Sequence, residues 1–409
     1  MKKTYKALLC GAAAVAAVGI AYAMDERFFE KAKDKLTVFK CRANSKIMEQ
    51  ALPLTDAMFP GPKVVSGADS AKKIPEVLKE LNVNKVMIVT GPTVGRTIVP
   101  PIAENLERHG IGYTIYDQVE ANPSVKTVEA IRAQYLENGC DGFLAIGGGS
   151  PMDAAKAAAA RVAKPNTPIG KMAGLMKVMI KVAPIVAVPT TSGTGSEVTM
   201  GAVISDHDER HKYAIMDPNL VPKYAVLDPK LTVSMPKFVT ATTGIDALTH
   251  AVESYVTWAY NNNASNRNAE EAVVKIFRNL KRAYEDGNDL EAREAMLIAS
   301  YKAGLAFNHT GVGYVHAIAH AMGGIYNTAH GLANAVIMPT NALTHSQNTA
   351  PGPPSVSAVA TPAMLPVPTV AASAVHMAAN GETPPLVRLA APVKQENSVF
   401  RSQSMQYRT

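Results

Sequence analysis

The sequence predicts a two-domain fold, in which a doubly wound α/β domain with a parallel sheet precedes an all-α domain. Between residues 59 and 235, short β-rich apolar runs alternate with helical segments, and this alternation is typical of a parallel sheet with right-handed crossovers. From residue 236 to about residue 348 the apolar residues recur with a helical period instead. A chain of 409 residues is long enough to bury a hydrophobic core in each domain.

The amino end has the pattern of a targeting segment followed by an extension. Residues 1–23 contain early lysines, an apolar run and the sequence Ala21-Tyr22-Ala23, as secretory signal peptides do. The apolar run is shorter than the roughly 20 residues that a membrane span needs, so we expect no membrane partner beyond this segment. Met24 follows directly, which leaves a later translation start as an alternative. Residues 24–58 are rich in charge and predict a loosely packed extension.

The composition argues against nucleic-acid binding and against a disulfide framework. The formal net charge is +7, but Lys and Arg are scattered and no basic stripe carries interleaved aromatic residues, so we expect no nucleic-acid partner. A phosphate-bearing cofactor is enough of an anion for such a charge. Cys10, Cys41 and Cys140 lie far apart without a CxxC pair, which indicates neither disulfides nor a thiolate metal site.

Four apolar runs predict the central strands, at 85–91, 111–117, 142–149 and 185–191. The segments between the first three runs have helical character, so we expect the strands to be parallel. Ligands of such sheets bind at the carboxyl ends of the strands. The loops that follow the third and fourth runs therefore carry candidate binding residues.

The loop GGGSPMD (147–153) follows the third run and opens an Ala-rich helix. Glycine lets the backbone approach a pyrophosphate, and the helix start offers free N–H groups and the positive end of its dipole. Pro151 suits the first helical turn. We predict that the loop binds the phosphates of a cofactor, through Gly148, Gly149, Ser150 and Asp153. The pattern is not GxGxxG, so a tight turn without a ligand is the alternative.

A second loop, PTTSGTGSEVT (189–199), closes the fourth apolar run and is dense in hydroxyl groups. Hydroxyls can donate hydrogen bonds to phosphate or ribose oxygens, while glycines keep the backbone close to the ligand. The loop is therefore a second candidate contact for the same cofactor.

The predicted helical domain contains a set of candidate metal ligands. Asp246 and His250 are four residues apart, and so are His316 and His320, so each pair would lie on one face of a helix, one turn apart. His330 follows ten residues later, where a turn could direct its ring back at the preceding helix. One carboxylate and several imidazoles are the donor set of a borderline divalent ion, Fe(II) or Zn(II).

The alternative for any one of these histidines is a buried core residue without a metal. A lone His on an apolar helix face is more often of that kind. Burying several imidazoles without a common partner would, however, leave donors and acceptors unpaired at about 1–3 kcal/mol each. A shared metal ion removes this cost, and we therefore favour the metal site.

The segments GIDALTHAVESY and GVGYVHAIAHAMGGIYNTAHGLANAVIMP resemble the two signature regions of the iron-dependent (group III) alcohol dehydrogenases. The resemblance covers roughly residues 59–348. It implies a dehydroquinate synthase-like fold, the metal ligands Asp246, His250, His316 and His330, and a catalytic, proton-handling role for His320 beside the metal.

The resemblance also implies where a nicotinamide cofactor binds. It places Asn122, Thr190, Thr191, Thr194 and Lys212 at the cofactor. At the end of the first predicted strand, many NAD-using relatives carry Asp where this chain has Gly91. Glycine removes the repulsion of a 2′-phosphate, but no neighbour is an evident cation for it. NAD and NADP are therefore both expected.

The resemblance implies a metal-dependent alcohol dehydrogenase that transfers hydride between NAD or NADP and a small alcohol or aldehyde, with Fe²⁺ or, as the alternative, Zn²⁺. Two other functions stay open. One is an enzyme of the glycerol dehydrogenase or dehydroquinate synthase type on the same fold. The other is an inactive relative that only binds nucleotide. We expect a homo-oligomer, and the need for the cofactor favours the cytoplasm over export.

The predicted tail, residues 349–409, is the main departure from the family. From residue 349 to Pro385 it has repeated prolines and one charged residue, Glu382, which predicts a disordered segment and cannot continue a helical bundle. The family normally has further helices there. This departure is the reason for keeping the inactive alternative.

Overall fold

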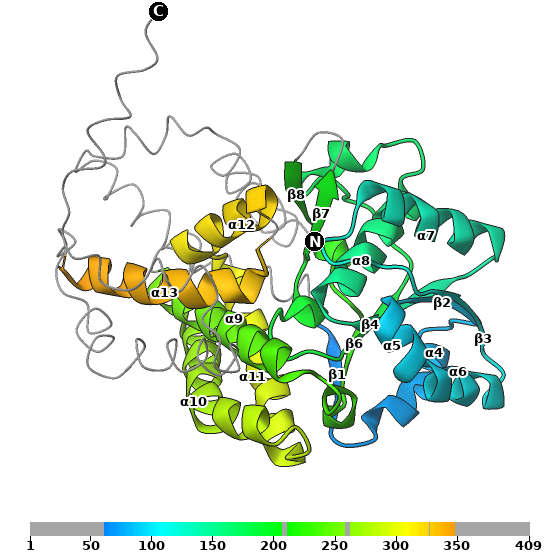
Figure 1. Ribbon diagram of the computed structural model, residues 1–409. Coiled ribbons are helices and arrows are strands. Elements are labelled where there is room, and N and C mark those ends of the chain that lie inside the picture. The colour runs from blue at the N-terminus through cyan, green and yellow to red at the C-terminus, as the bar shows by residue number, and fades with distance from the viewer. Residues whose placement is uncertain (1–60, 207–210, 258–261, 327, 348–409) are drawn as a thin grey trace, which may run out of the picture.

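The structure, a computed structural model, describes residues 61–206, 211–257, 262–326 and 328–347. The predicted segments 1–23, 24–58 and 349–409 lie outside the described residues, and the expectations for them stay predictions. Figure 1 shows a sheet with helices on both faces, packed beside a group of helices from the later part of the chain.

A parallel six-stranded sheet forms the first part, with strand order β1-β9-β6-β4-β2-β3. Its strands are β1 (Lys63–Ser66), β2 (Lys85–Val89), β3 (Gly112–Tyr116), β4 (Gly142–Gly147), β6 (Ile185–Pro189) and β9 (Tyr224–Leu227). Strands β2, β3, β4 and β6 confirm the four predicted ones, with slightly shorter ends. The sequence does not predict β1 and β9, because each has only four residues.

Helices cover both faces of this sheet, as the doubly wound prediction requires. They are α4 (Ile74–Glu80), α5 (Pro92–Thr97), α6 (Val99–Arg108), α7 (Val125–Glu137) and α8 (Gly149–Ala163). Side chains alternate along each strand, so Met87 and Val89 of β2 join a core with α7 and α8. Val86 and Ile88 point the other way and join a second core with α4 and α6.

A smaller sheet lies beside the carboxyl end of the large one. Strands β7 (Gly201–Asp206) and β8 (His211–Met216) pair antiparallel, and β5 (Gly174–Leu175) pairs parallel with β8. Lys212 belongs to β8, the second strand of this β7–β8 hairpin. Short 3₁₀ helices complete this part: η2 (Ser70–Lys73), η3 (Ile169–Met172), η4 (Ser196–Val198), η5 (Pro218–Leu220) and η6 (Pro229–Thr232).

The second part is helical, as predicted. It comprises α9 (Lys237–Val256), α10 (Asn263–Glu285), α11 (Leu290–Thr310), α12 (Tyr314–Tyr326) and α13 (His330–Gln347). Helix α9 is central, because it packs against α10, α11 and α13. A Cβ added to Gly244 would lie 2.4 Å from Leu280 Cδ1. Glycine at this position therefore lets α9 and α10 approach closely.

The two parts meet through glycine-to-glycine contact. Gly195, in the loop after β6, has a φ of 61°, and a Cβ there would lie 2.7 Å from the Cα of Gly304 in α11. Gly304 in turn would place a Cβ 3.0 Å from the Cα of Gly195. Neither position has space for a side chain, so the loop and the helix touch backbone to backbone.

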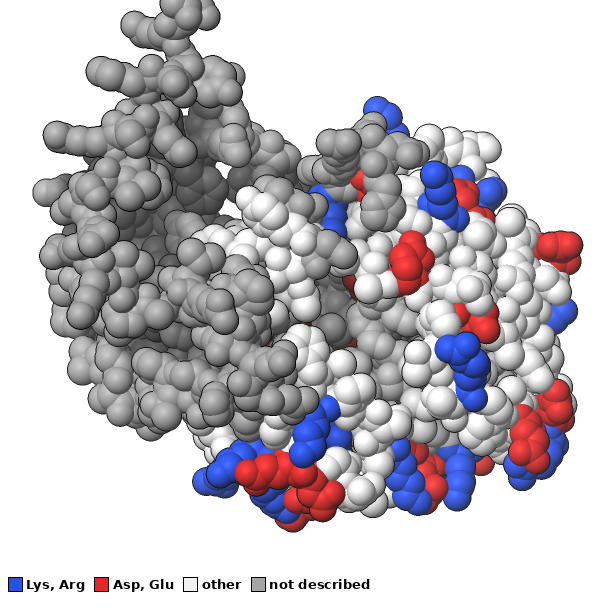
Figure 2. Space-filling model, in the orientation of Figure 1, with Lys and Arg blue, Asp and Glu red and all other residues white. Residues whose placement is uncertain are grey.

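Two further expectations from the sequence concern membrane spans and the distribution of charged side chains on the surface. None of the helices within the described ranges is long and apolar enough to cross a membrane. Figure 2 shows acidic and basic side chains interspersed along the lower edge of the face in view. The domain limits at residues 59, 235 and 348 stay predictions, although η6 ends at Thr232 and α9 begins at Lys237.

Candidate metal and cofactor site

Helix α9 contributes two of the predicted ligands. It begins after Pro236, which has no N–H to pair, and continues for 20 residues. Asp246 and His250 lie one turn apart on it, and both are buried. The spacing of four residues therefore directs both side chains to the same side of the helix, as predicted.

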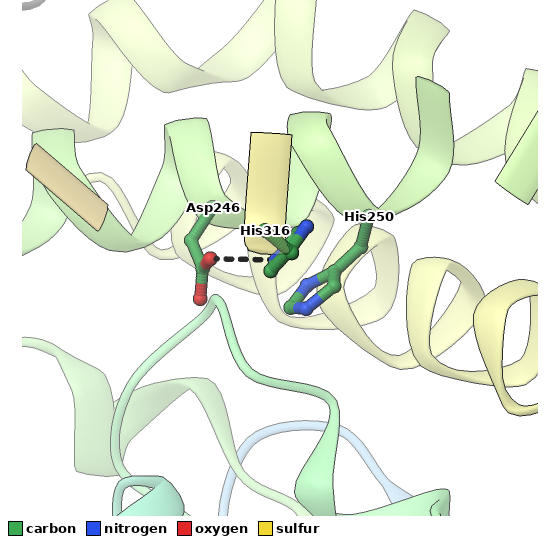
Figure 3. Close-up of side chains that lie close together, drawn as sticks. All are labelled: Asp246, His250 and His316. Atoms are coloured by element: carbon green, nitrogen blue, oxygen red, sulfur yellow. Dashed lines mark ion pairs between the residues drawn. The ribbon is translucent and has the colours of Figure 1, made fainter. Parts of the chain in front are cut away.

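His316 of α12 joins this pair. Ligand atoms of Asp246, His250 and His316 all lie within 4.8 Å of one another, and the three side chains point toward one another in Figure 3. The Nε2 atom of His316 is 3.5 Å from Asp246 Oδ1. The rings of His250 and His316 stack with their centroids 4.3 Å apart. The fold thus gathers three donors from two helices that are far apart in the sequence.

His330 is the first residue of α13, and its Nε2 is 3.5 Å from Asp246 Oδ1. The helix start can approach α9 because the next residue is glycine. A Cβ on Gly331 would lie 2.2 Å from the carbonyl oxygen of Thr242. The structure therefore places the other three ligands implied by the resemblance, His250, His316 and His330, around Asp246.

His320 has a different position. It is exposed, and its ring centroid is 4.7 Å from that of His330 and 6.3 Å from that of His316. It lies one turn beyond His316 on α12, at the rim of the cluster. His250 and His316 are buried and His330 is half-buried, so His320 is the most exposed histidine of the cluster.

The electrostatics of the cluster suit a cation. Burial lowers the pKa of His250 to about 3, so its ring is neutral and offers a lone pair. Burial opposes ionisation of Asp246, but His250 and His330 lower its pKa below the usual range. Burial also acts against a charge on His316, yet hydrogen bonds to Asp246 and Glu253 raise its pKa to about 9. The buried carboxylates of Asp246 and Glu253 thus favour positive charge in the cluster, and a divalent ion would supply it.

The donor set fits the implied metal. A carboxylate with three imidazoles provides oxygen and nitrogen ligands for Fe(II) or Zn(II). Asn334 of α13 gives a second indication. Its Nδ2 donates to Asp246 Oδ1 at 2.7 Å and lies 3.3 Å from His316 Nε2 and 3.5 Å from His330 Nε2. One polar hydrogen-bearing atom thus lies among three ligand atoms, where an ion would be attracted.

The loops after β4 and β6 meet at the predicted cofactor residues. A Cβ added to Gly148 would lie 3.1 Å from Thr191 Oγ1, and one on Gly149 would lie 3.0 Å from Thr194 Cγ2. These glycines let the two loops lie close together. The structure therefore places the loop at 147–153, here called the glycine loop, beside the loop at 189–199, here called the threonine loop, at the carboxyl end of the sheet.

Asn122, Ser150 and Lys212 form one connected group. Asn122 has a φ of 60°, and its backbone N–H donates to Ser150 Oγ at 3.3 Å. Lys212 Nζ donates to Asn122 Oδ1 at 3.0 Å. A Cβ on Gly323 of α12 would lie 3.6 Å from Lys212 Nζ. The lysine thus reaches from the hairpin to the helix that carries His316.

Gly91 and Thr190 lie beyond the carboxyl ends of β2 and β6, the two strands on either side of β4. Gly91 is the N-cap residue of α5, two residues after the end of β2. Thr190 is buried after β6, and its N–H donates to the carbonyl of Gly147 at 2.8 Å. A Cβ on Gly91 would lie 3.1 Å from the Val119 carbonyl oxygen, so a side chain at this position would be crowded.

Asp153 points into the protein. Its carboxylate accepts hydrogen bonds from Ser196 Oγ at 2.9 Å and from the Val203 N–H at 3.0 Å. The ammonium of Lys156, one helical turn away, is fully buried, and its three N–H groups have five oxygens of Ser196, Thr199 and Gly201 within hydrogen-bond distance. Asp153 therefore joins α8 to the threonine loop and β7, and a direct cofactor contact stays a prediction.

The sequence interpretation missed two buried polar residues of the metal cluster. Glu253 accepts a hydrogen bond from His316 Nδ1 at 2.6 Å, and Asn334 contacts three of the ligands. Glu253 lies seven residues after Asp246, on the same helix face. This spacing would allow Glu253 to be identified from the sequence. Asn334 lies four residues after His330, again one helical turn away.

Comparisons with known proteins agree with these observations. The family described as iron-containing alcohol dehydrogenase matches residues 61–229, and the family described as Fe-containing alcohol dehydrogenase, C-terminal, matches residues 240–359. Alcohol dehydrogenase 4 of Saccharomyces cerevisiae (strain YJM789) is 37% identical over 274 residues, which cover 67% of this chain and 71% of that protein. An NAD-dependent methanol dehydrogenase of Bacillus methanolicus is 37% identical over 287 residues, covering 70% and 74%.

Solved structures show the same relationship. A 1,3-propanediol oxidoreductase aligns with a TM-score of 0.71 and 31% identity, over 81% of this chain and 89% of that one. A sulfoacetaldehyde reductase from Bifidobacterium kashiwanohense, in complex with NAD⁺, aligns with a TM-score of 0.68 and 26% identity, over 77% and 83%. The fold, the gathered donors and the matched sequence regions lead to one conclusion: this chain belongs to the iron-containing alcohol dehydrogenase family.

Proposed function

We propose that this chain transfers hydride between a small alcohol or aldehyde and a nicotinamide cofactor at a metal centre formed by Asp246, His250, His316 and His330. One observation carries the assignment of the centre. Three buried donor atoms from two helices lie within 4.8 Å of one another, close to a loop that the family resemblance assigns to the cofactor. Such a cluster has no evident purpose in packing alone.

The four residues would hold Fe(II), or Zn(II) as the alternative. A divalent ion bound there supplies Lewis acidity to the oxygen of the alcohol or aldehyde. The contribution of the chain is to hold the reacting groups in line and to exclude water from them. The burial of Asp246, His250 and His316 supports the second task.

The cofactor would bind along the edge where the strands of the large sheet end. In this proposal Gly148, Gly149, Thr191 and Thr194 surround the phosphates. Lys212 and Asn122 lie between this group and α12, which suits the end of the cofactor that approaches the metal centre. Exposed His320, beside His330, would pass a proton between the reacting oxygen and solvent.

NAD and NADP both remain candidates. Gly91 offers no carboxylate to repel a 2′-phosphate, and the bound cofactor of the sulfoacetaldehyde reductase mentioned above is NAD⁺. The named relatives include alcohol, methanol and lactaldehyde oxidoreductases, so neither the glycerol dehydrogenase nor the dehydroquinate synthase alternative is favoured. The supply of nicotinamide nucleotides favours action in the cytoplasm, and a homo-oligomeric state stays a prediction.

The proposal is tested by purifying the full chain without oxygen and measuring metal per chain together with oxidoreduction of NAD(H) and NADP(H) on short alcohols and aldehydes. We expect iron or zinc at about one ion per chain and turnover with at least one cofactor. Asp246→Asn, which keeps the shape of the side chain but removes its charge, should lose both metal and turnover. Turnover by a protein that carries no metal would contradict the proposed centre.

A further inference from the structure

The carboxylate of Glu253 collects three hydrogen bonds at the start of α12. Its Oε2 accepts from the backbone N–H of Gly313 at 2.8 Å and from Nδ1 of His316 at 2.6 Å. Its Oε1 accepts from the backbone N–H of Val315 at 2.7 Å. The side chain is only 6% exposed. A buried carboxylate that accepts three hydrogen bonds is fixed in position, because each hydrogen bond restricts the rotation of the side chain.

Glu253 belongs to the helix that carries two of the metal ligands. It lies seven residues after Asp246 and three after His250 on α9, so all three side chains share one face of this helix. The donors to Glu253 come from a later part of the chain, since Gly313 lies 60 residues and His316 lies 63 residues after it. Helix α9 thus contacts the third ligand through this carboxylate as well as through Asp246.

The hydrogen bond from His316 to Glu253 determines the tautomer of the His316 imidazole. A carboxylate accepts, so Nδ1 of His316 must carry the proton that it donates. The other nitrogen, Nε2, faces Asp246 Oδ1 and Asn334. With its proton held on Nδ1, the neutral ring presents the Nε2 lone pair to the centre, which is the tautomer that a metal needs.

We propose that Glu253 is a positioning residue of the metal centre, which holds His316 in the metal-binding tautomer and orientation while it anchors the start of α12. This inference rests on the proposed function, because Glu253 can position His316 for a metal ion only if His316 binds one. The residue touches neither substrate nor cofactor in this proposal and acts through His316 alone.

A glycine at residue 313 makes the contact sterically feasible. A Cβ added to Gly313 would lie 2.7 Å from Glu253 Oε1 and 3.0 Å from its Cδ. An alanine there would therefore displace the carboxylate without changing any ionisable or metal-binding group. Gly313→Ala thus perturbs the same contact from the other side.

The competing explanation is that Glu253 only caps α12, since the N–H groups of Gly313 and Val315 lie at its first turn and lack helical partners. The chain offers a matched control for that role. Asp289 is the N-cap residue of α11, and its carboxylate accepts from the Ala292 N–H at 3.0 Å. The carboxylate of Asp289 contacts Ala292 and Arg282 and, among the described residues, none of the metal-ligand candidates. Asp289→Ala removes a capping carboxylate of the same helical part and nothing from the centre.

The experiment measures metal affinity rather than turnover. The full-length wild type and the variants Glu253→Ala, Glu253→Gln, Gly313→Ala and Asp289→Ala are stripped of metal, and Co(II) is titrated in against a competing chelator. The visible absorption bands of bound Co(II) report the ligand geometry, and the Tm of each metal-free protein is recorded in parallel.

We expect Glu253→Ala and Gly313→Ala to raise the Kd for Co(II) by about 10–100-fold, the usual effect of removing the outer partner of a ligating histidine. Glu253→Gln keeps the shape of the side chain but offers one oxygen to three donors, so we expect a smaller rise with altered absorption bands. Asp289→Ala should lower the Tm and leave the Kd and the bands unchanged.

Two results would overturn the inference, and they are distinguishable. If the wild type binds Co(II) while Glu253→Ala and Glu253→Gln bind it equally tightly with unchanged bands, Glu253 is a helix cap only and the metal centre stands. If the wild type itself binds no Co(II), the proposed centre fails, and the role of Glu253 fails with it.

Discussion

Nδ1 of His250 lies 3.3 Å from the carbonyl oxygen of Gly193. Gly193 belongs to the threonine loop after β6, whereas His250 is a metal-ligand candidate on α9. The carbonyl can only accept, so Nδ1 carries the proton and Nε2 is free for the metal. A backbone oxygen of the predicted cofactor loop thus orients a residue of the metal cluster.

This contact predicts that the variant Gly193→Ala loses metal and cofactor affinity together. A Cβ at residue 193 would lie 2.6 Å from Thr243 Cβ and 2.7 Å from the Thr243 carbonyl oxygen, so the loop must move away from α9. We expect the Kd values for Co(II) and for NAD(H) or NADP(H) each to rise by about tenfold or more, since a tenfold change corresponds to only about 1.4 kcal/mol. Equilibrium titrations of both ligands would measure this.

The matched control is Gly201→Ala, because among the described residues no heavy atom lies within 4 Å of a Cβ at that position. This variant should leave both Kd values unchanged. If Gly193→Ala weakens the binding of only one of the two ligands, the loop does not couple the two sites.

The ligand histidines should differ from the helper histidine. His250→Ala, His316→Ala and His330→Ala each remove a donor that lies close to Asp246, so each should lower metal content and abolish nearly all turnover. His320→Ala should keep the metal and lower the turnover by about 10–100-fold, since it removes a proton-handling group and no ligand. Metal per chain and turnover are measured for all four variants.

His109 is exposed at the end of α6, so His109→Ala serves as the control for losing a histidine far from the cluster. It should leave both quantities unchanged. An empty site in His320→Ala, together with full metal content in one of the other three, would show that the ligand assignment is wrong.

Gly91→Asp should shift the cofactor preference toward NAD(H). A carboxylate after β2 would accept from the ribose hydroxyls and repel a 2′-phosphate. Because a Cβ there lies 3.1 Å from the Val119 carbonyl oxygen, Gly91→Ala is needed to separate crowding from charge. The ratio of kcat/KM for NAD(H) and NADP(H) should change in Gly91→Asp and stay constant in Gly91→Ala. Equal ratios in all three proteins would place Gly91 away from the adenosine end of the cofactor.

Buried Glu197 should make stability depend on pH. Burial raises its pKa to about 7 from an ordinary value of 4.5, although Lys156 acts in the opposite direction. Between these two pH values the folded state retains a proton that the unfolded state has released. The contribution of Glu197 to the free energy of unfolding is therefore fully present below pH 4.5 and is lost as the pH rises through 7.

Glu197→Gln, which stays neutral, should consequently gain stability relative to the wild type as the pH is raised from about 5 to about 8. Urea unfolding of both proteins across this range measures the difference. Glu137 is exposed at the end of α7, and Glu137→Gln should show no such trend. A stability difference between Glu197→Gln and the wild type that does not vary with pH would mean that Glu197 ionises in the folded state as freely as in the unfolded chain.

The sequence predicts the fold class because its periodicities are local. The apolar run at residues 85–91 and the helical period after residue 236 each follow from neighbouring side chains alone. Strands β1 and β9 are not predicted, because four residues are too few to show a clear periodicity. Their pairing also joins Lys63 to Tyr224, which lie at opposite ends of the first part of the chain. Strand order is a property of the assembled sheet, so single segments do not indicate it.

In the candidate site, too, local spacings are visible in the sequence, whereas contacts between distant segments are not. The spacing of Asp246 and His250 lies within one helix and is visible in the sequence, and the family resemblance supplies His316 and His330. The partner of Glu253, in contrast, is 63 residues away, and no local pattern connects them. The inward orientation of Asp153 likewise depends on Ser196 and Val203, which only folding brings to it.

The backbone contact between Gly195 and Gly304 has a consequence for the reaction coordinate. Hydride transfer requires the reacting atoms to approach to about 3–3.5 Å, and in the proposed enzyme the cofactor is held by loops of the sheet and the substrate by the helices. A Cβ at residue 195 would lie 2.7 Å from Gly304 Cα, so even one methyl group would push the halves apart. The glycine pair therefore lets the sheet loop and the helix approach as closely as two backbones can, and in the proposed enzyme a side chain at either position would lengthen the distance for hydride transfer.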